Sequence, residues 1–461
     1  TATPDGTSDS FDVLILGAGA AGLQAAAVLT RHGRTVCILE ARNRIGGRIF
    51  TCRESGLQVP IELGAEFIHG PAPLTRAALA KTRSSVADVG GTRWQHNREA
   101  PPNVRTAGRS DRLDPGDELF AELERGLAAA GRPREDMAFA DYLAGPASRT
   151  LSDAARELAR ALAEGFDAVD TSRASTLALL DEWAGDSAAG GPTYRPLRGY
   201  VCLIDALYAA IDARYSRLLL EAPIERVGWE RGAVTAEGHR YGRSLRVSAA
   251  RAVVALPLGV LQRPPGEPGS VRFAPALNAK QQALAGLAEG PALKIVLRFR
   301  EPFWEALESG RFHDGAFFHA PEAAFPTLWT ALPVRAPILT AWAGGPKAAR
   351  LRSAGTDIVQ AALESVEAVF GVSPPHASSL EAAYVHDWQD DPFARGAYSY
   401  VTVGAGEARK SLAAPVEDTL FFAGEAADTE GGAATVEGAL RTGMRAAHQV
   451  LGSLEPDRVR A

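Results

Sequence analysis

The sequence has little cysteine. Its 461 residues include only Cys37, Cys52 and Cys202. An odd number without a CxxC pair argues against a disulfide framework and a thiolate metal site, so we expect no metal. Cys37 lies in an apolar run and is predicted to be buried. So few cysteines favour a reducing compartment, and a cytoplasmic protein is expected; a periplasmic or secreted location stays open if a signal peptide has been removed.

The sequence also lacks long hydrophobic runs and an excess of positive charge. No stretch reaches the roughly 18 consecutive apolar residues that a transmembrane helix requires, so no membrane span is expected. Lys and Arg total 49 against 55 Asp and Glu, which gives a formal net charge of -6, and the cations are scattered. These numbers predict neither a nucleic-acid partner nor an anionic membrane surface. The polar residues 1–10 are expected to be a disordered lead or a processed end.

What the sequence does contain is a strand–turn–helix pattern at its start. Residues 11–16 are an apolar run with the length of a buried parallel strand, a helix is predicted through about residue 29, and residues 35–39 predict a second strand. Between the first strand and the helix, Gly17, Gly19 and Gly22 complete the spacing GxGxxG, with Ala21 before the third glycine. The first glycine permits a tight turn, the second lets the backbone approach a pyrophosphate, and the third lets helix and strand pack closely.

An acid and a basic loop follow the second strand. Glu40 ends this strand, where a carboxylate can accept hydrogen bonds from a ribose diol. Next come Ala41 and Arg42, and then the pair Gly47 and Arg48. Guanidinium groups suit a diphosphate because their planar fork donates two parallel charge-assisted bonds. These residues predict a dinucleotide site and favour FAD over NAD.

The remaining chain alternates between helical and strand-like segments. Helical periodicity covers residues 117–130, 152–162, 358–370 and a last segment from about 435 to before 452. Strand-like runs cover residues 218–220, 251–256, 292–299 and 419–423. A Pro-, Gly- and Arg-rich stretch, about residues 90–116, predicts a long surface excursion. We therefore expect an α/β protein, α+β overall. A Rossmann-type FAD-binding domain would be assembled from discontinuous segments, with an interleaved substrate domain of mixed sheet plus helices and the ligand at their seam.

Several motifs, in this order, resemble the flavin-containing amine oxidase family, which includes monoamine, polyamine and histone-demethylase-type oxidases. The resemblance is strong at the chain ends and patchy in the middle. It rests on residues 17–22, 40–51, 62–70, 256–261, 294, 388, 396–400, 422–425 and 438–439. It implies an FAD-binding domain made of residues 8–77, 199–291 and 395–457, and a substrate-binding domain made of residues 78–198 and 292–394.

The resemblance also implies which residues hold the FAD. Arg42 and Arg48 would contact the ribose and pyrophosphate, Ile224 the adenine, and Gly424 and Glu425 the ribityl–pyrophosphate portion. The flavin ring would be lined by Leu63, Gly64, Ala65 and Glu66, with Trp388 as a neighbour. Thr435 and Val436 would lie at a helix N-terminus that faces the flavin O2. A helix dipole there stabilises the charge of reduced flavin. Glu425 also fits an N-capping acid.

The expected chemistry involves Lys294, Tyr398, His69 and Thr435. Burying the Lys294 ammonium is costly unless it is paired, and the pattern alone also fits a lysine on the wet face of an alternating strand. In the family the matching lysine holds a water near flavin N5 and assists the reaction with O2. Tyr398 matches an aromatic residue that flanks the amine, and Thr435 stands where monoamine oxidases carry the partner aromatic. His69 either orients a cationic amine or is a structural histidine.

The resemblance implies an FAD-dependent amine oxidase. It would deaminate a primary or secondary amine oxidatively by hydride transfer to flavin N5, with O2 reduced to H2O2. Ala397 stands where monoamine oxidases carry the cysteine that bonds the flavin, so non-covalent FAD is expected. The partners would be a small-molecule amine and O2, with the oligomeric state open between monomer and homodimer.

Other functions stay open from the sequence alone. An L-amino-acid oxidase of the same family needs an arginine for the substrate carboxylate, and Arg195 or Arg198 could serve. A catalytically reduced FAD-binding module is a further alternative, against which Lys294 and Tyr398 argue. A desaturase-like dehydrogenase would carry a more apolar substrate entrance, which the sequence does not reveal.

Overall fold

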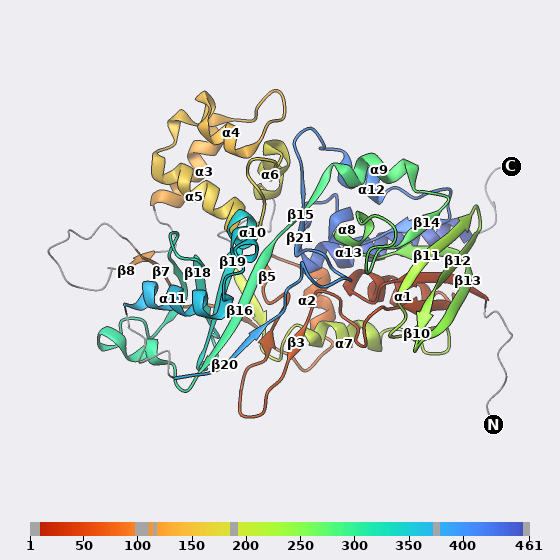
Figure 1. The fold of residues 1–461 in the computed structure, drawn as a ribbon, viewed down its shortest axis with the longest axis horizontal. Helices are drawn as coiled ribbons and strands as arrows, with labels where there is room; N and C mark the ends of the chain where they lie inside the picture. Colours follow the sequence, from red (N-terminus) through yellow and green to blue (C-terminus); the bar gives the residue numbers. More distant parts are fainter. Residues whose placement is uncertain (1–9, 97–109, 114–117, 185–191, 372–378, 455–461) are drawn as a thin grey trace.

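The computed structural model describes residues 10–96, 110–113, 118–184, 192–371 and 379–454. Two large β-sheets lie at opposite ends of an elongated molecule, with smaller sheets and loops between them (Figure 1). Of the polar lead at residues 1–10, only Ser10 is described, and it begins the first strand. The expected α/β class with a Rossmann-type sheet is confirmed.

The first sheet contains the nucleotide-binding unit. Its strands lie in the order β10 (Ser216–Leu219), β2 (Val36–Leu39), β1 (Ser10–Leu16), β13 (Arg243–Val254), β12 (Ala233–Arg240), β11 (Ile224–Glu230) and β14 (Arg272–Ala274), with β22 (Leu420–Phe422) beside β13. The strands β10, β2, β1, β13 and β22 pair in parallel, as the sequence predicts. The strands β11, β12 and the first half of β13 form an antiparallel meander that sequence reasoning missed.

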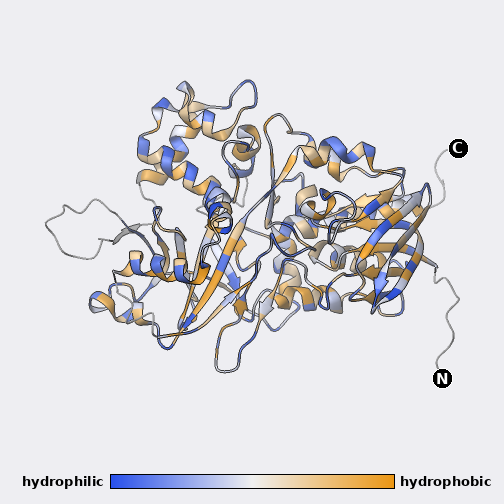
Figure 2. Cartoon of the chain, in the orientation of Figure 1, coloured by the Kyte–Doolittle hydropathy of each residue, from blue (hydrophilic) through white to orange (hydrophobic). Residues whose placement is uncertain are grey.

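Helices cover both faces of this sheet because the side chains of β1 alternate. Val13 and Ile15 pack into a core with α1 (Ala20–Arg31), α2 (Pro73–Leu79), α7 (Val201–Ala209) and α13 (Val436–Leu454). Leu14 and Leu16 pack into a second core with α9 (Asn278–Ala285) and α12 (Ala408–Ala413). Both faces of the strand are therefore apolar, as expected for parallel sheets. Figure 2 shows hydrophobic residues along the strands of both large sheets.

The second sheet belongs to the other end of the molecule. Its order is β20 (Leu380–Val385), β16 (Ala292–Phe299), β19 (Ile338–Gly344), β18 (Thr327–Thr330), β17 (Gly315–His319), β7 (Thr92–His96) and β8 (Ser110–Leu113). One face packs against α11 (Ile358–Phe370) in an aromatic-rich core. A lobe of helices lies above the sheet in Figure 1: α3 (Glu118–Ala130), α4 (Phe139–Ala144), α5 (Asp153–Gly165) and α6 (Thr176–Trp183).

Short elements fill the space between the two large sheets. They are β3 (Thr51–Cys52) with β4 (Ile61–Glu62), β5 (Ile68–His69) and β6 (Val86–Asp88) on β9 (Thr193–Pro196), β15 (Leu287–Gly290) with β21 (Tyr398–Val401), and the helices α8 (Leu258–Leu261) and α10 (Gly345–Ser353). They bring residues from distant parts of the chain to the middle of the molecule. The domain bounds predicted from the sequence stay a prediction.

One sequence expectation is wrong. The predicted surface excursion at residues 90–116 contains the paired strands β7 and β8 in its described parts. Trp94 of β7 is 7% exposed and packs edge-on against Phe312, and this burial outweighs the loop-like composition around it. For Lys294, the alternative of a wet strand face is excluded: the residue is 5% exposed, because both faces of β16 are covered.

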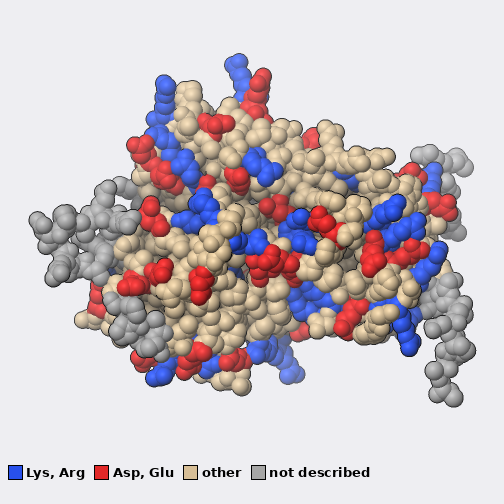
Figure 3. Space-filling model, in the orientation of Figure 1, with Lys and Arg blue, Asp and Glu red and all other residues tan. Residues whose placement is uncertain are grey.

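The visible surface carries charges of both signs, interspersed rather than gathered into one patch (Figure 3). No helix in the described ranges combines the length and the hydropathy that crossing a bilayer would need.

Candidate active site

One elongated cavity runs from the first sheet to the second. It contains about 1500 Å³ of atom-free space, open solvent included. At one end it is lined by the turn after β1, by Glu40 and by Ile224; at the other end it is lined by Lys294 and Tyr398. The cavity therefore joins the predicted nucleotide loop to the predicted catalytic residues, although these lie far apart in the chain.

The nucleotide end is built from closely approaching loops. Gly17 has φ +100°, a conformation that side chains rarely adopt, and a Cβ on Gly22 would lie 2.0 Å from the Gly17 carbonyl oxygen. A Cβ on Gly47 would lie 3.3 Å from the Cα of Gly19, so the two glycine loops meet backbone to backbone. Glu40 braces both loops, because its carboxylate accepts hydrogen bonds from the N–H groups of Ala18 (2.8 Å) and Arg42 (2.9 Å).

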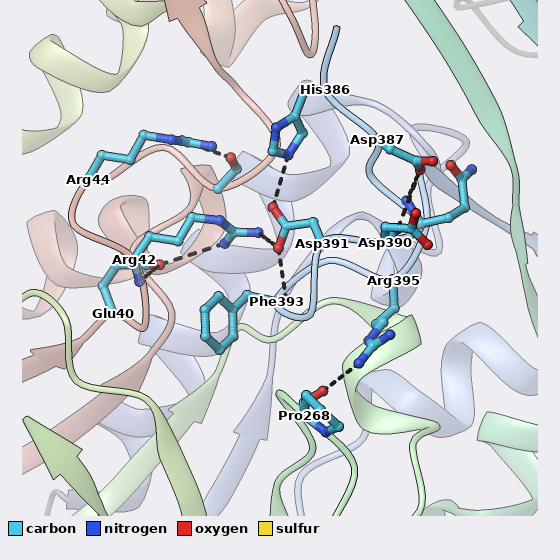
Figure 4. Close-up of polar contacts among 12 residues, drawn as sticks. Glu40, Arg42, Arg44, Pro268, His386, Asp387, Asp390, Asp391, Phe393 and Arg395 are labelled. Carbon is cyan, nitrogen blue, oxygen red and sulfur yellow. Dashed lines mark hydrogen bonds and ion pairs between the residues drawn. The ribbon is translucent and has the colours of Figure 1, made fainter. Parts of the chain in front are cut away.

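The side chain of Arg42 is held in place by the loop between β20 and β21, residues 386–397, which we call the strap (Figure 4). Its Nη2 donates to Asp391 at 2.7 Å, and Asp391 also pairs with His386 at 2.9 Å and accepts from the Phe393 N–H at 2.9 Å. Although burial opposes it, these partners lower the pKa of Asp391 well below its usual range. Asp391 is therefore a fixed anion that orients the cation of Arg42, and Phe393 from the same strap lines the cavity.

A second arginine, Arg48, crosses the middle of the cavity. Its guanidinium donates to the Ala397 carbonyl at 2.6 Å and to Glu425 at 3.1 Å. Glu425 also accepts from the Ser399 hydroxyl at 2.6 Å. The residue at the N-cap of the short helix Glu425–Ala427 is Gly424, and no side-chain capping bond is formed there, so the capping alternative for Glu425 is wrong. Burial acts against ionisation of Glu425, but Arg48 and Arg409 outweigh it and lower its pKa.

Lys294 is paired at the other end of the cavity. Its Nζ lies 2.6 Å from Glu66 Oε2 and donates to the Gly64 carbonyl at 3.1 Å. Glu66 is shared with Arg195, 3.1 Å away, and with the Trp329 indole N–H, also at 3.1 Å. Burial opposes the charge of Glu66, but Lys294 and Arg195 lower its pKa. Lys294, Glu66 and Arg195 thus form one buried group of paired charges, and Lys294 is the member that lines the cavity.

Two aromatic rings face each other at this end. Trp342 and Tyr398 have centroids 6.1 Å apart at an interplanar angle of 33°, and both line the cavity. The Trp342 indole donates to the Gly165 carbonyl at 2.6 Å, which fixes the ring. Burial raises the pKa of Tyr398, so its hydroxyl stays protonated. Trp388 lies nearby, donating from its indole to the Leu63 carbonyl at 2.9 Å.

Thr435 is the cap of α13. Its Oγ1 accepts from the Gly438 N–H at 3.0 Å, which satisfies a free donor in the first turn of the helix. Thr435 and Val436 both line the cavity, so the positive end of the helix dipole faces it.

The other predicted site residues divide into two groups. The cavity wall includes Ala21, Ala41, Leu63, Gly64, Ala65, Gly424 and Glu425 as well as the residues above. Three predicted residues lie outside that lining: Gly22, Glu66 and His69. Gly22 packs behind the turn. His69 stacks edge-on against Phe166 at 5.1 Å, and burial and Arg93 lower its pKa to about 4, so its imidazole is neutral.

Sequence reasoning missed Asp167 at the active-site end. This carboxylate accepts from the Trp183 indole N–H at 2.8 Å, and its charge acts on Tyr398. Burial raises the pKa of Asp167 to about 7. Its position follows from the turn after α5, where Ala168 packs on Gly290 beside Tyr398. No local motif signals such a contact.

The two arginines considered for a substrate carboxylate do not line the cavity. Arg195 is paired with Glu66, and Arg198 is exposed. Among the described residues there is also no cluster of three or more His, Cys, Asp or Glu side chains that could hold a metal ion.

A family model for flavin containing amine oxidoreductases matches residues 20–451. The chain belongs to this family. It is therefore a flavin-dependent oxidoreductase that acts on amines. Polyamine oxidase 3 of Oryza sativa subsp. japonica is 28% identical over 96% of this chain and 89% of its own length. Lysine-specific histone demethylase 1 homolog 3 of Arabidopsis thaliana is 27% identical over 96% of this chain, which spans 30% of that relative's length.

Solved structures share the fold. A putrescine oxidase bound to putrescine has a TM-score of 0.77 at 20% identity, with 96% of this chain and 99% of the other covered. Cyclohexylamine oxidase from Brevibacterium oxydans IH-35A has a TM-score of 0.75 at 24% identity, with coverages of 97% and 100%. The architecture with two large sheets is thus that of known amine oxidases.

Proposed function

We propose that the chain is an FAD-dependent amine oxidase that deaminates a primary or secondary amine oxidatively and reduces O2 to H2O2. The observation that carries this proposal is the single cavity that begins at the Gly17–Gly19 turn and ends between Lys294 and the ring pair Trp342 and Tyr398. The overall change removes two electrons and two protons from the amine and adds them to O2, and water then converts the imine to a carbonyl compound.

The residues along the cavity suit an FAD molecule. The glycine loops and the N-terminus of α1 present backbone N–H groups suited to a pyrophosphate, and Arg42 and Arg48 supply cations beside them. Glu40 braces these loops and offers its carboxylate to a ribose diol. The N-terminus of α13 offers a positive dipole end for the flavin ring. When bound, FAD supplies the hydride acceptor, N5, and the reductant of O2.

The protein's own residues would orient the amine and control its protons. Trp342 and Tyr398 line the cavity side by side and would orient the amine against their rings and exclude water from the reacting carbon. Lys294, held by Glu66 and the Gly64 carbonyl, is placed to hold a water at the cavity wall and to aid the O2 half-reaction.

Non-covalent binding is proposed because no thiol is placed to bond the flavin. All three cysteines lie in the described ranges, and none of them lines the cavity. Ala397 lines it instead, with its carbonyl bound to Arg48. Acid precipitation of the purified protein should leave a yellow supernatant and a colourless pellet; flavin absorbance in the washed pellet would contradict this part of the proposal.

The amine oxidase proposal is tested by a peroxide-release screen over polyamines, aromatic monoamines, alkylamines and amino acids. We expect H2O2 formation with at least one amine and bleaching of the flavin absorbance by that amine under anaerobic conditions. A chain that binds no flavin even after reconstitution, or a flavin that no amine bleaches, would refute the proposed function.

A further inference from the structure

The sheet face that carries Lys294 continues as an aromatic wall away from the cavity. Strand pairing aligns two rows of side chains on this face. The first is Lys294, Trp342, Thr327, His319 and Gln95, and the second is Val296, Thr340, Trp329, Phe317 and Arg93. The row between them, from Ile295 to Trp94, points to the opposite face, into the core with α11. Strand alternation therefore places Arg93 on the same face as Lys294.

Rings connect the cavity to this arginine. The Trp342 ring lies next to Tyr398. Its centroid is 6.2 Å from that of Trp329, and the Trp329 centroid is 6.4 Å from that of Phe317. The Arg93 guanidinium carbon then lies 5.0 Å from the centre of the Phe317 ring. Trp342, Phe317 and Arg93 all keep part of their surface accessible. Trp329 between them is buried, and the partly exposed ring of Phe67 packs against both Trp329 and Phe317. A long amine held at Tyr398 would extend along these rings towards Arg93.

Among the residues that the structure describes, no carboxylate forms an ion pair with Arg93, and burial lowers the pKa of its guanidinium. The charge of Arg93 acts on two neighbouring histidines. Burial, and to a smaller extent Arg93, lowers the pKa of both His69 and His319 to about 4. Glu66, which accepts from the Trp329 indole of the wall, is already bound by Lys294 and Arg195. Among the described side chains, the far end of the wall therefore presents the guanidinium of Arg93.

The ring faces along this wall are also already used by cations of the protein. Lys294 lies over Trp329 at 5.6 Å, and Arg195 lies over Phe67 at 5.1 Å. Together with Arg93 over Phe317, these cations occupy the π faces that would otherwise attract an ammonium group. A second positive charge on a substrate would find repulsion there, while an anion would find a half-buried guanidinium.

We propose that Arg93 selects the substrate by charge: it favours long amines whose far end is anionic, such as a carboxylate, and rejects polyamines. The inference rests on the proposed amine oxidation at Tyr398 and names its substrate class. Arg93 lies four strands from Lys294, on the order of 20 Å along the sheet. The charge selection should therefore grow with the length of the amine and be absent for short ones.

Three matched series test this proposal: alkylamines, α,ω-diamines from putrescine to diaminododecane, and ω-amino carboxylates of the same lengths. For the long members, kcat/KM of the amino carboxylate should exceed that of the diamine by about tenfold or more. Arg93→Gln should abolish this ratio, Arg93→Glu should invert it, and Arg93→Lys should keep it. The alkylamines should change little in all three variants, which separates charge selection from a folding defect.

Arg311→Gln is the matched control, because Arg311 lies over Trp94 on the opposite face of the sheet. Its charge removal should leave the ratio unchanged. Long diamines oxidised as well as amino carboxylates, with no response to Arg93→Glu, would overturn the inference and leave amine oxidation intact. If no amine is oxidised at all, the proposed function fails, and the anion site is then tested by binding alone. Decanoate should bind the wild type more tightly than Arg93→Gln. Equal affinity of the two proteins for decanoate would overturn the inference.

Discussion

The side chain of Lys294 lies at the junction of a charge cluster and the cavity. Its partners, Glu66 and the Gly64 carbonyl, keep the ammonium in place although the residue is 5% exposed. A buried ammonium with one anionic partner is well suited to attract a developing negative charge during O2 reduction. The same pairing makes the residue costly to replace, because Glu66 then keeps only Arg195 as its cation.

Lys294→Met should slow flavin reoxidation by O2 by about tenfold or more and change flavin reduction by the amine much less. Stopped-flow absorbance of the two half-reactions measures this. Lys280→Met is a matched control, since Lys280 is 2% exposed and donates to the Ser411 and Ala414 carbonyls away from the cavity. It should lower stability without changing the ratio of the two rates. Equal slowing of both half-reactions in Lys294→Met would remove the role proposed for this lysine.

Glu62 makes a different kind of prediction, because its pKa is raised. Burial dominates and raises the pKa to about 7 from a usual value of 4.5, against hydrogen bonds from Thr51 and the Tyr200 N–H. A raised pKa means that the protonated form favours folding. Its contribution to the free energy of unfolding is complete below about pH 4.5 and is lost as the pH rises to about 7.

Glu62→Gln should remove this pH dependence. The variant should gain stability relative to the wild type between those two pH values, by on the order of 2 kcal/mol at the upper end. Chemical denaturation at several pH values measures the difference, and comparison with the wild type cancels the other buried carboxylates, Asp167 and Glu289, whose pKa values are raised as well. A difference that is constant with pH would contradict the raised pKa.

At the scale of elements, α1 and α13 both begin at the cavity, and the first turn of α1 packs closely on the middle of α13. A Cβ on Gly443 of α13 would lie 2.2 Å from the Ala21 carbonyl oxygen of α1. Gly452 lies in the same helix with nothing within 4 Å of its Cβ position. The two glycines therefore have opposite roles: the first permits a close helix crossing, and the second only weakens the helix.

Gly443→Ala should destabilise the protein by roughly 2–4 kcal/mol, because the helices must move apart. Gly452→Ala should be neutral or stabilising by up to about 1 kcal/mol, since alanine has the higher helix propensity. Thermal or chemical unfolding of both variants gives the comparison. Equal effects of the two substitutions would mean that the helix crossing tolerates a methyl group.

The strap between β20 and β21 is the element that fixes Arg42. Asp391→Asn removes the anion that holds this guanidinium and His386, so FAD affinity should fall by about tenfold. Asp390→Asn is the control, because that neighbouring carboxylate is exposed and pairs with Arg352 instead. Titration of the apoprotein with FAD by fluorescence quenching measures both. Unchanged affinity in Asp391→Asn would show that Arg42 does not depend on the strap.

Local signals explain which elements could be predicted. The helix α11 was predicted with its bounds, 358–370, because Asp357 caps its start and Gly371, at φ 63°, ends it. The strands β17 and β18 carried no comparable signal, since each is short and gains its stability from neighbours distant in sequence. The same holds within the site. The glycine turn and Glu40 are local motifs, whereas Asp391 and Asp167 act through contacts that only the folded chain creates.

At the scale of the whole molecule, the cavity is lined from both large sheets. A ligand that fills it binds the folded chain only, and it therefore stabilises both halves together. If FAD occupies this cavity, it should raise the unfolding temperature of the apoprotein by several degrees, in proportion to the logarithm of its concentration. Differential scanning calorimetry with FAD, and with AMP as a control that spans one end only, measures this. A shift with AMP as large as that with FAD would contradict binding across both sheets.

The strand β22 enters the first sheet beside β13 and is followed by α13, although β1 and the glycine turn lie at the other end of the chain. During synthesis on the ribosome, more than four hundred residues separate the turn from Thr435, and the pocket is complete only after Thr435 has been made. Until then one side of β13 has no neighbour at residues 252–254, and the nascent chain must keep that edge from pairing wrongly. Cofactor capture is consequently a late event, because it requires β22 and the first turn of α13.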